Sequence, residues 1–394
     1  GVPQESYPGE RRVALDPASV KRLRQAKMDV VIECGAGTRA GFTDEEYLAA
    51  GAVCCEDREA AFQADMVLQV RALGTNLIAG RRDLDAYRLG QWIVGFWDPL
   101  GAPFAVAAAA EKGVHCVALE LIPRTTRAQS MDALSSMATL VGYRAVLLAA
   151  TELPRVFPLL MTAAGTLSPA RVLVIGAGVA GLQAMATAKR LGAVVDGYDI
   201  RPAAREQVES VGARFAEVPL EATNVEVEGG YAREMDHSFQ SSQQSGLARH
   251  IAAADVVITT AMIPGRPSPL LISEDAVRRM RPGSVIVDVA AERGGNCPLT
   301  RADERVQAHG VTILGPTNAS SDLPYHASQM LGRNLSELVP LLAQAREAGG
   351  ALTDEIARAA VITGDYRILN PQVHELSLRS LEEESRMTRK AAGP

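Results

Sequence analysis

A short segment in the middle of this 394-residue chain limits its fold more than any other feature. Residues 171–175 read Arg-Val-Leu-Val-Ile, the composition of a buried strand, and the turn 176–181, Gly-Ala-Gly-Val-Ala-Gly, follows at once. A helix to about Leu191 is predicted next, with Gly192 at its C-terminal end, and residues 194–199 are predicted to form the following strand. Strand, glycine turn, helix and strand in this order indicate a βαβ unit of a parallel sheet.

The glycines of this turn have separate uses in a dinucleotide site. Gly176 permits the tight turn, Gly178 lets the backbone approach a pyrophosphate, and Gly181 lets the helix pack close to the sheet. Asp199 ends the next strand, where a carboxylate accepts hydrogen bonds from the adenosine ribose. A carboxylate repels a 2′-phosphate and so favours NAD over NADP, whereas the nearby Arg201 is a residue type that accommodates that phosphate. We therefore expect NAD, with a Rossmann-like fold that binds nothing as the alternative.

The same domain is predicted to continue with more strands. They are expected at 214–218, 256–261, 284–289 and 311–314, and Ser273 is expected to cap a helix between two of them. Met262 directly follows one of these strands, at the sheet edge where ligands of doubly wound sheets bind. Its position suits contact with an adenosine and ordinary core packing equally, so spacing alone does not decide its role.

The first 120 residues alternate between helix and strand signals. Predicted helices run from Asp16-Pro17 to about Met28, from Thr43 to near Gly51, and over 102–112 before Gly113. Predicted strands lie at 29–33, 66–70, 91–96 and 114–121. This alternation predicts another domain with a largely parallel sheet.

The predicted fold class is α/β, with two Rossmann-like domains, each with a mainly parallel sheet, joined by long helices. Residues 130–152 are apolar at helical spacing, contain Gly142 as the one internal breaker, and are predicted to form a helix that connects the domains. One domain is expected to comprise 1–136 together with 320–394, and the NAD-binding domain 137–319.

Two further segments are polar. Residues 219–237 form a long, glycine-bearing stretch that is typical of a lid over a bound ligand, although a disordered insertion has the same composition. The charged residues from Pro371 onward are expected to be a loosely held tail, with an interaction segment as the alternative.

Composition excludes several classes of function. Lys and Arg total 40 against 46 Asp and Glu, so the chain lacks the basic field that a nucleic acid partner requires. Apolar runs such as 104–110 are shorter than the roughly 18 residues that cross a membrane, and no signal peptide is expected. Five cysteines and six scattered histidines without metal-ligand spacing predict reduced thiols in a cytosol-facing protein and no metal site.

A polar cluster lies just before the connecting helix, and it contains Arg124, Gln129, Asp132 and Ser135. The last three are three residues apart, so on a helix or its first turn they share roughly one face. Helix capping and a surface ion pair would explain these residues without any function. The cluster holds no histidine, lysine or cysteine for proton transfer, but a hydride that passes directly between two nicotinamide rings needs only positioning and electrostatics from the protein.

Several segments together resemble a known family. They are 123–136 (PRTTRAQSMDALSS), 162–165 (TAAG), 176–183 (GAGVAGLQ), 229–232 (GGYA) and 287–297 (VDVAAERGGNC). They are similar to the NAD-binding alpha subunit of proton-translocating nicotinamide nucleotide transhydrogenase, within the alanine dehydrogenase/transhydrogenase superfamily. The resemblance extends from Gly1 to about Leu338, and its specific part is the arginine-to-aspartate segment of the polar cluster, since the glycine turn occurs in many families.

The resemblance implies that NAD(H) binds to this chain and NADP(H) to a partner subunit, with hydride transfer coupled to proton translocation by membrane subunits. It further implies a cytoplasmic homodimer docked at the inner face of the membrane through those subunits, with NAD held between the two domains. The nicotinamide end is then held by Arg124, Gln129, Asp132 and Ser135, with Gln129 near the transferring carbon. The other implied cofactor-binding residues are Thr125, Thr126, Ser130, Met131, Gly176, Gly178, Val179, Ala180, Gly181, Asp199, Ile200, Arg201, Gly230, Gln243 and Met262, of which Gly230 lies in a closing loop.

Two other functions compete with this reading. Alanine dehydrogenase shares the fold and the Arg-Val-Ala-Leu segment that begins at Arg12, but its chemistry needs an acid and a base. The positions that match its acid and base by resemblance are Arg71, the segment near Trp97-Asp98, and Glu292. An arginine is a poor proton shuttle because its pKa lies above about 12. A module that binds NADH without catalysis is the second alternative.

Overall fold

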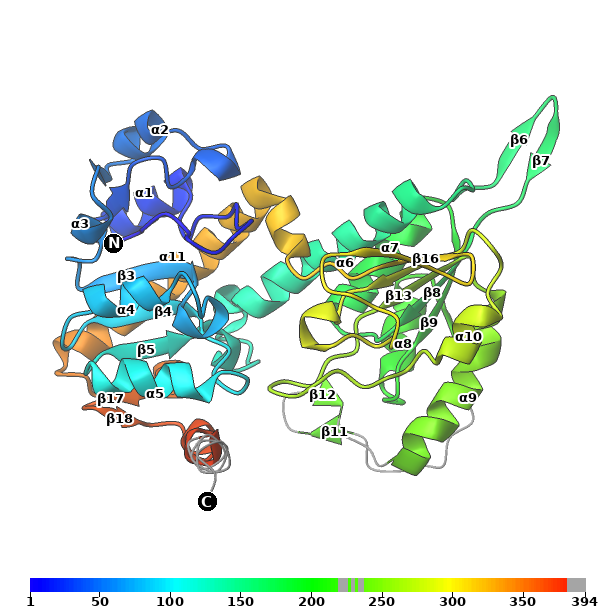
Figure 1. Ribbon diagram of the computed structural model, residues 1–394. Coiled ribbons are helices and arrows are strands. Elements are labelled where there is room, and N and C mark those ends of the chain that lie inside the picture. The colour runs from blue at the N-terminus through cyan, green and yellow to red at the C-terminus, as the bar shows by residue number, and fades with distance from the viewer. Residues whose placement is uncertain (219–225, 228–230, 233–236, 381–394) are drawn as a thin grey trace, which may run out of the picture. The chain divides into compact units, whose positions relative to one another are not determined.

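The computed structural model describes residues 1–218, 226–227, 231–232 and 237–380. It divides into two compact units (Figure 1). Unit 1 comprises Gly1–Met137 and Leu323–Pro394, and unit 2 comprises Ala138–Asp322. Each unit carries parallel strands and helices, so the predicted α/β class with mainly parallel sheets is confirmed.

Unit 2 is built on a seven-stranded sheet in the order β10-β9-β8-β13-β14-β16-β15. Its strands are β8 (Arg171–Ile175), β9 (Val194–Tyr198), β10 (Arg214–Phe215), β13 (Val256–Thr259), β14 (Val285–Asp288), β15 (Arg305–Ala308) and β16 (Val311–Leu314). All neighbouring pairs are parallel except β15 with β16, which is antiparallel. Strands β8 and β16 have the bounds predicted from the sequence, whereas β15, a half-exposed edge strand, was not predicted.

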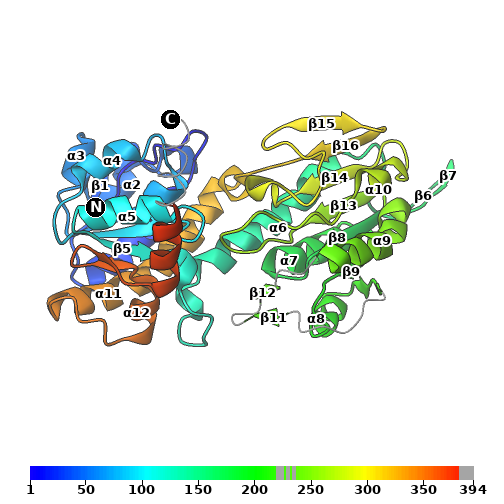
Figure 2. The same cartoon turned by 60° about the horizontal axis from the view of Figure 1, so that its bottom comes forward.

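Helices cover both faces of this sheet (Figure 2). They are α6 (Ala133–Glu152), α7 (Val179–Arg190), α8 (Ala204–Ser210), α9 (His237–Ala253) and α10 (Glu274–Arg278), the last capped by Ser273 as predicted. Side chains alternate along β8: Val172 and Val174 pack with α6 and α7, whereas Leu173 and Ile175 pack with α9 and α10. The sheet is therefore buried on both faces, which explains its uninterrupted Val and Ile runs.

Helix α6 begins later than predicted and carries an unexpected property. Asp132 has ψ of 84°, outside the helical range, so the helix starts at Ala133 rather than at residue 130. By length and composition α6 is apolar enough to cross a membrane, which the apolar runs of the sequence did not predict. Its residues Ala145, Val146 and Ala149 nevertheless pack in the core of unit 2, as in a buried helix of a globular domain.

A β-hairpin extends from unit 2 in both views (Figures 1 and 2). It consists of β6 (Leu160–Thr162) and β7 (Gly165–Leu167), which pair antiparallel, and every residue of both strands is exposed. A second antiparallel pair is formed by β11 (Glu226–Val227) and β12 (Tyr231–Ala232). The other residues of the lid predicted over 219–237, including Gly230, lie outside the described residues, except His237, which begins α9.

Unit 1 contains the parallel strands β3 (Met66–Arg71), β4 (Trp92–Phe96) and β5 (His115–Ala118), and the parallel pair β1 (Val31–Glu33) and β2 (Val53–Cys55). The first residues link these two sets, because Val2 N donates to Val31 O at 2.8 Å and Leu68 N donates to Gly1 O at 2.8 Å. The helices in this region are α1 (Pro17–Gln25), α2 (Asp44–Ala49), α3 (Arg58–Ala61), α4 (Arg81–Ala86) and α5 (Pro103–Glu111). Asp16 caps α1 and Thr43 caps α2 in a capping box, as predicted.

The C-terminal region of the chain completes unit 1. It forms α11 (Pro324–Glu347), α12 (Glu355–Ala360) and the antiparallel pair β17 (Thr363–Gly364) and β18 (Arg367–Ile368). Thr363 Oγ1 accepts a hydrogen bond from Cys116 N at 2.7 Å, which ties this segment to β5. Residues 371–380 are helical, and Val373 is fully buried in the unit 1 core, so the prediction of a loose tail from Pro371 is wrong for this stretch.

Candidate functional site

The glycine turn of unit 2 has the shape of a phosphate-binding loop. Gly176 has φ of +103°, and a Cβ on Gly181 would lie 1.7 Å from the carbonyl oxygen of Gly176, so both positions require glycine. A Cβ on Gly178, in contrast, would meet no atom of the described residues within 4 Å beyond its own chain neighbours. The space above Gly178 is thus open to a ligand, and the chain there does not need glycine for its own packing.

Helix α7 offers its N-terminus at this open position. Gly178 is the N-cap residue, it contributes no side-chain cap, and the first turn contains no acidic residue. The N–H groups of this turn and the positive end of the helix dipole are therefore suited to an anion. Helix α6 packs closely against the first turn of α7, because a Cβ on Gly142 of α6 would lie 2.0 Å from Ala180 O. Val179 is exposed and Ala180 half-buried, beside the open space.

Asp199 follows β9 at the carboxyl edge of the sheet, beside the glycine turn. Its Oδ2 accepts a hydrogen bond from Ala177 N at 2.7 Å, and its Oδ1 accepts one from Arg201 N at 2.9 Å. The Arg201 side chain binds both carboxylate oxygens, with Nε 2.9 Å from Oδ1 and Nη2 3.0 Å from Oδ2. Asp199, a residue type that favours NAD, and Arg201, a residue type that accommodates NADP, therefore form an ion pair. Ile200 between them is half-buried.

Two other predicted contacts lie in unit 2. Gln243 on α9 is buried and donates from Nε2 to the Tyr198 hydroxyl at 3.0 Å, directly before Asp199. Burial raises the pKa of Tyr198 to about 12, so the hydroxyl keeps its proton. Met262 is 44% exposed beyond the end of β13, so it is not the core residue that spacing also allowed.

The polar cluster of unit 1 divides into two groups. Asp132 is next to the start of α6 and accepts hydrogen bonds from Ser135 N at 2.8 Å and Ser135 Oγ at 2.6 Å. Gln129 lies in a separate 3₁₀ turn, Gln129–Met131, so the expectation that it shares a helix face with Asp132 and Ser135 is wrong. Gln129 is exposed, as is Arg124 earlier in the loop. We refer to residues 122–135 as the polar loop.

Segments from the far end of the chain hold the polar loop in place. Asn334 on α11 donates from Nδ2 to Ser130 O at 2.7 Å, and its own Oδ1 is buried without a hydrogen-bond partner among the described residues. Arg127 binds both carboxylate oxygens of Asp354 at 2.7 Å. Neither anchor was predicted from the sequence, because no local pattern indicates contacts between residues this far apart. Thr125, Thr126 and Ser130 are exposed and Met131 is half-buried.

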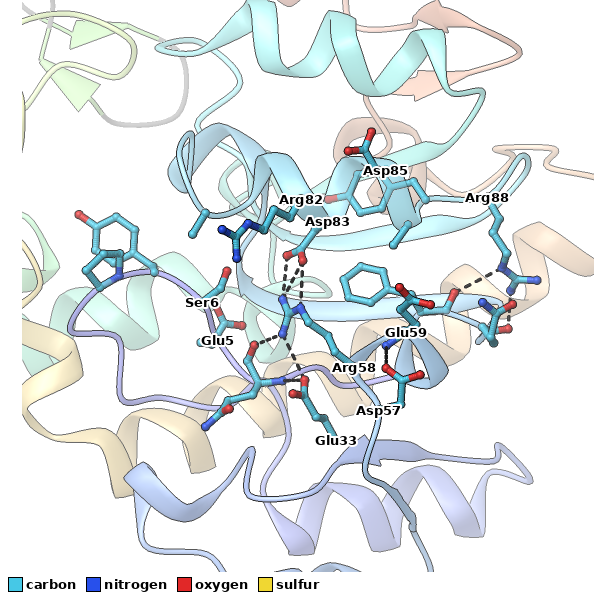
Figure 3. Close-up of a pocket in the computed structure, with 18 of the residues that line it drawn as sticks. Glu5, Ser6, Glu33, Asp57, Arg58, Glu59, Arg82, Asp83, Asp85 and Arg88 are labelled. Atoms are coloured by element: carbon cyan, nitrogen blue, oxygen red, sulfur yellow. Dashed lines mark hydrogen bonds and ion pairs between the residues drawn. The ribbon is translucent and has the colours of Figure 1, made fainter.

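Unit 1 also contains a polar pocket of about 980 Å³ that was not predicted from the sequence. Arg58 lies at its centre (Figure 3). The guanidinium binds both oxygens of Asp83, at 2.8 and 2.9 Å, and Glu33 Oε2 at 3.2 Å, and it also donates to Gln4 O. The charge of Arg58 is therefore matched by the chain's own carboxylates.

A buried charge network lies next to this pocket. Glu10 is fully buried and binds Arg12 through both oxygens, at 2.7 and 2.6 Å, and Arg71 Nε at 3.3 Å. Burial opposes ionisation of Glu10, but the two guanidinium groups more than reverse this and hold its pKa well below the ordinary value. Burial and the neighbouring Glu10 raise the pKa of Glu5 to about 8.

The positions matched to the alanine dehydrogenase acid and base have different surroundings. Arg71 pairs with Glu10 and lies 4.2 Å over the Tyr7 ring, so its charge is structural. Trp97 is buried and donates from Nε1 to Ile93 O at 3.2 Å. Asp98 N donates to Glu120 at 2.6 Å, and burial raises the pKa of Glu120 to about 7. Glu292 in unit 2 is exposed.

Comparisons with known proteins place both units in one family. Residues 1–141 match the N-terminal domain, and residues 145–371 the C-terminal domain, of the family described as alanine dehydrogenase/PNT. The chain belongs to the alanine dehydrogenase/PNT family. Within the described residues, no group of His, Cys, Asp or Glu has the arrangement of a metal site.

Relatives from both branches of the alanine dehydrogenase/PNT family share the fold. An NAD(P) transhydrogenase subunit alpha polypeptide of Rhodospirillum rubrum is 44% identical over 374 residues, 94% of this chain and 97% of the relative. The crystal structure of transhydrogenase from Sinorhizobium meliloti is 40% identical, with a TM-score of 0.80, and covers 94% of this chain and 98% of its own. L-alanine dehydrogenase reaches a TM-score of 0.79 at 25% identity, covering 96% and 99%. The fold is common to both branches, whereas identity is higher to the transhydrogenases.

Proposed function

We propose that this chain is the NAD(H)-binding subunit of a proton-translocating NAD(P) transhydrogenase. NADH bound here passes a hydride directly to NADP+ on a partner subunit, and membrane subunits couple this step to proton movement. The observation that carries the proposal is the chemistry of the polar loop, which presents an arginine, an amide, a carboxylate and a hydroxyl but no histidine, lysine or cysteine. Ring-to-ring hydride transfer requires no such group.

Unit 2 is proposed to hold the adenosine diphosphate end of the nucleotide. The N–H groups of Val179, Ala180 and Gly181, at the uncapped start of α7, are suited to the pyrophosphate. The open space at Gly178 lets the nucleotide approach the backbone. Asp199 and Met262 are the proposed contacts of the ribose and the adenine, and NAD is the proposed ligand because the carboxylate disfavours a 2′-phosphate.

The polar loop of unit 1 is proposed to bind the nicotinamide end of NAD(H). The exposed Gln129 and Arg124 supply hydrogen-bond donors that suit a carboxamide and a ribose hydroxyl. Asp132 and Ser135 bind each other and fix the start of α6, so their proposed contribution is to orient the loop as well as to bind the ligand. Catalysis then depends on placing the donor carbon against the acceptor ring.

The test combines the purified chain with an NADP-binding transhydrogenase subunit and measures reduction of NADP+ by NADH. We expect transfer in the mixture, and we expect Gln129→Asn to slow it while the Kd for NADH stays nearly unchanged. NADH binding without transfer would identify a binding module instead. Turnover of L-alanine by the chain alone would assign it to the dehydrogenase branch.

Assembly belongs to the same proposal. The hairpin β6–β7 exposes Leu160, Met161 and Leu167 to solvent, Met161 to 79%, and an apolar arm of this kind suits a second copy of the chain. We propose a cytoplasmic homodimer that is held at the membrane by its partner subunits. Sedimentation of a Met161→Glu/Leu167→Glu variant should then give a smaller species than the parent chain, and equal sedimentation would refute this role of the hairpin.

A further inference from the structure

The hydrogen-bonding capacity of Asp199 is already used by the protein. An ionised carboxylate has about four lone-pair positions for acceptance. Ala177 N, Arg201 N, Arg201 Nε and Arg201 Nη2 supply four donors between 2.7 and 3.0 Å, two on each oxygen. The side chains of Asp199 and Arg201 are only 8% and 15% exposed, so the pair is largely shielded from water.

This saturation conflicts with the role proposed for Asp199 in binding the adenosine ribose. Two ribose hydroxyls need acceptor positions on the same carboxylate. The two backbone N–H groups belong to the glycine turn and to the segment after β9, so they are integral to the fold. The two guanidinium donors are the ones among these four that a side-chain rotation can remove.

We infer that the Arg201 side chain is an internal competitor for the adenosine ribose, so that NAD(H) must displace it from Asp199 in order to bind. This inference rests on the proposed function, because it assumes that the nucleotide binds to unit 2. Arg201 thereby becomes a specificity-determining residue instead of a simple ligand. It weakens binding of an unmodified ribose, and once displaced it remains beside the ribose, where a positive charge lessens the discrimination against a 2′-phosphate.

The experiment isolates the ribose contribution with a pair of probes. AMP and 2′-deoxy-AMP carry the same phosphate and base and differ in one ribose hydroxyl, so the ratio of their Kd values reports how well the carboxylate receives that hydroxyl. Calorimetry on the full chain gives this ratio for the parent, for Arg201→Gln and for Arg201→Lys, which keeps the charge without the two-pronged geometry. Arg214→Gln is the matched control, because Arg214 of β10 pairs at 2.9 Å with Asp196 of β9, the strand that directly precedes Asp199.

We expect the ratio of the Kd for 2′-deoxy-AMP to that for AMP to rise about fivefold in Arg201→Gln, since a hydrogen bond to a free carboxylate is worth on the order of a tenfold change in affinity. Arg201→Lys should give a smaller rise, and Arg214→Gln none. NADH should be preferred over NADPH more strongly in Arg201→Gln than in the parent.

An unchanged ratio in Arg201→Gln would overturn the inference, and a lower one would show that Arg201 binds the ribose directly. If Arg201→Gln fails to fold, the ratio in Arg201→Lys decides by the same criterion. A parent chain that binds neither NADH nor AMP removes the proposed function and this inference together. A parent that binds both, with the expected ratios but no hydride transfer, removes the proposed function alone.

Discussion

The glycine turn of unit 2 and the polar loop of unit 1 are held in different ways. In unit 2 the glycine turn follows β8 and Asp199 follows the next strand along the chain, β9, and the bond that joins them links residues 22 positions apart. In unit 1 the polar loop is held by Asn334 and Asp354, whose partners are 204 and 227 positions away. One region is a local motif that brings its own geometry, and the other depends on a distant return of the chain. Substitutions in the glycine turn should therefore act by straining the backbone. Substitutions at the anchors of the polar loop should act by changing the orientation of the loop.

The largest effect is expected in unit 2, where Gly181→Ala places a Cβ 1.7 Å from a backbone oxygen. The clash cannot be relieved by a side chain, so we expect a loss of about 3 kcal/mol or more in the free energy of unfolding, measured by urea denaturation. Gly178→Ala is the control, because its Cβ meets nothing within 4 Å in the part of the chain that the structure describes, its chain neighbours aside. It should leave unfolding nearly unchanged and weaken NADH binding, and normal NADH affinity in this control would contradict the proposed approach of the ligand.

In unit 1 we expect instead that the free energy of unfolding depends on pH. Because burial and Glu10 raise the pKa of Glu5 to about 8, the folded chain keeps this proton between about pH 4.5 and pH 8 while the unfolded chain loses it. Stability therefore falls as pH rises through this window, by more than about 1 kcal/mol, given roughly 1.4 kcal/mol per pKa unit.

Glu5→Gln should flatten that dependence, measured by urea unfolding at several pH values. Glu111→Gln removes an exposed glutamate from the same unit and should leave the slope as it is. Equal slopes in the parent and in Glu5→Gln would show that Glu5 does not carry the buried proton.

The anchor of the polar loop is tested by Asn334→Ala. Removing the hydrogen bond to Ser130 O frees the loop, and we expect hydride transfer to NADP+ to slow about tenfold, in line with a loss of positioning, while the Kd for NADH changes little. Ser336→Ala on the same helix removes a hydroxyl that donates within α11, to Arg333 O at 2.9 Å, and should transfer hydride normally. A rise in the NADH Kd with an unchanged transfer rate would mean that Asn334 serves binding and not orientation.

The smallest effect is expected for the exposed ion pair of the loop. Asp354→Asn keeps an acceptor for Ile356 N at the start of α12 but weakens the bond to Arg127. We expect hydride transfer to slow about twofold, and this loss of rate should be smaller at high salt, which screens the ion pair in the parent. Breaking the Arg346–Asp65 pair by Arg346→Gln removes an exposed bridge elsewhere in unit 1 and serves as the control. A larger loss in Asp354→Asn than in Asn334→Ala would reverse the ranking of the two anchors.

The features that could be predicted from the sequence are those with short-range causes. Strand β8 and its glycine turn are defined by a buried run and by backbone geometry, and Asp16, Thr43 and Ser273 cap helices within four residues of themselves. The helix over 371–380 was missed because its surface residues are polar, and the burial of Val373 in a core made by distant residues stabilises it.

In the candidate site the same limit applies. The spacing of three predicted that Gln129, Asp132 and Ser135 share one helix face. Instead, the Asp132 side chain accepts a hydrogen bond from Ser135 N in the first turn of α6, and Asp132 itself lies outside the helix, between α6 and the 3₁₀ turn of Gln129. The sequence also did not predict that Arg201 occupies acceptor positions of the Asp199 carboxylate, because residue types near a site do not reveal which of them bind one another.

The return of the chain to unit 1 also orders events during synthesis. Unit 2 is one continuous stretch, so all of its residues have been synthesised before α11 begins. Unit 1 starts before unit 2, but its core includes Ile362 and Val373, and β5 receives its partner Thr363 only after the whole of unit 2 has been made. The nascent chain therefore exposes an incomplete core of unit 1 while all of unit 2 is being made, and of the two units the one that begins earlier is completed later.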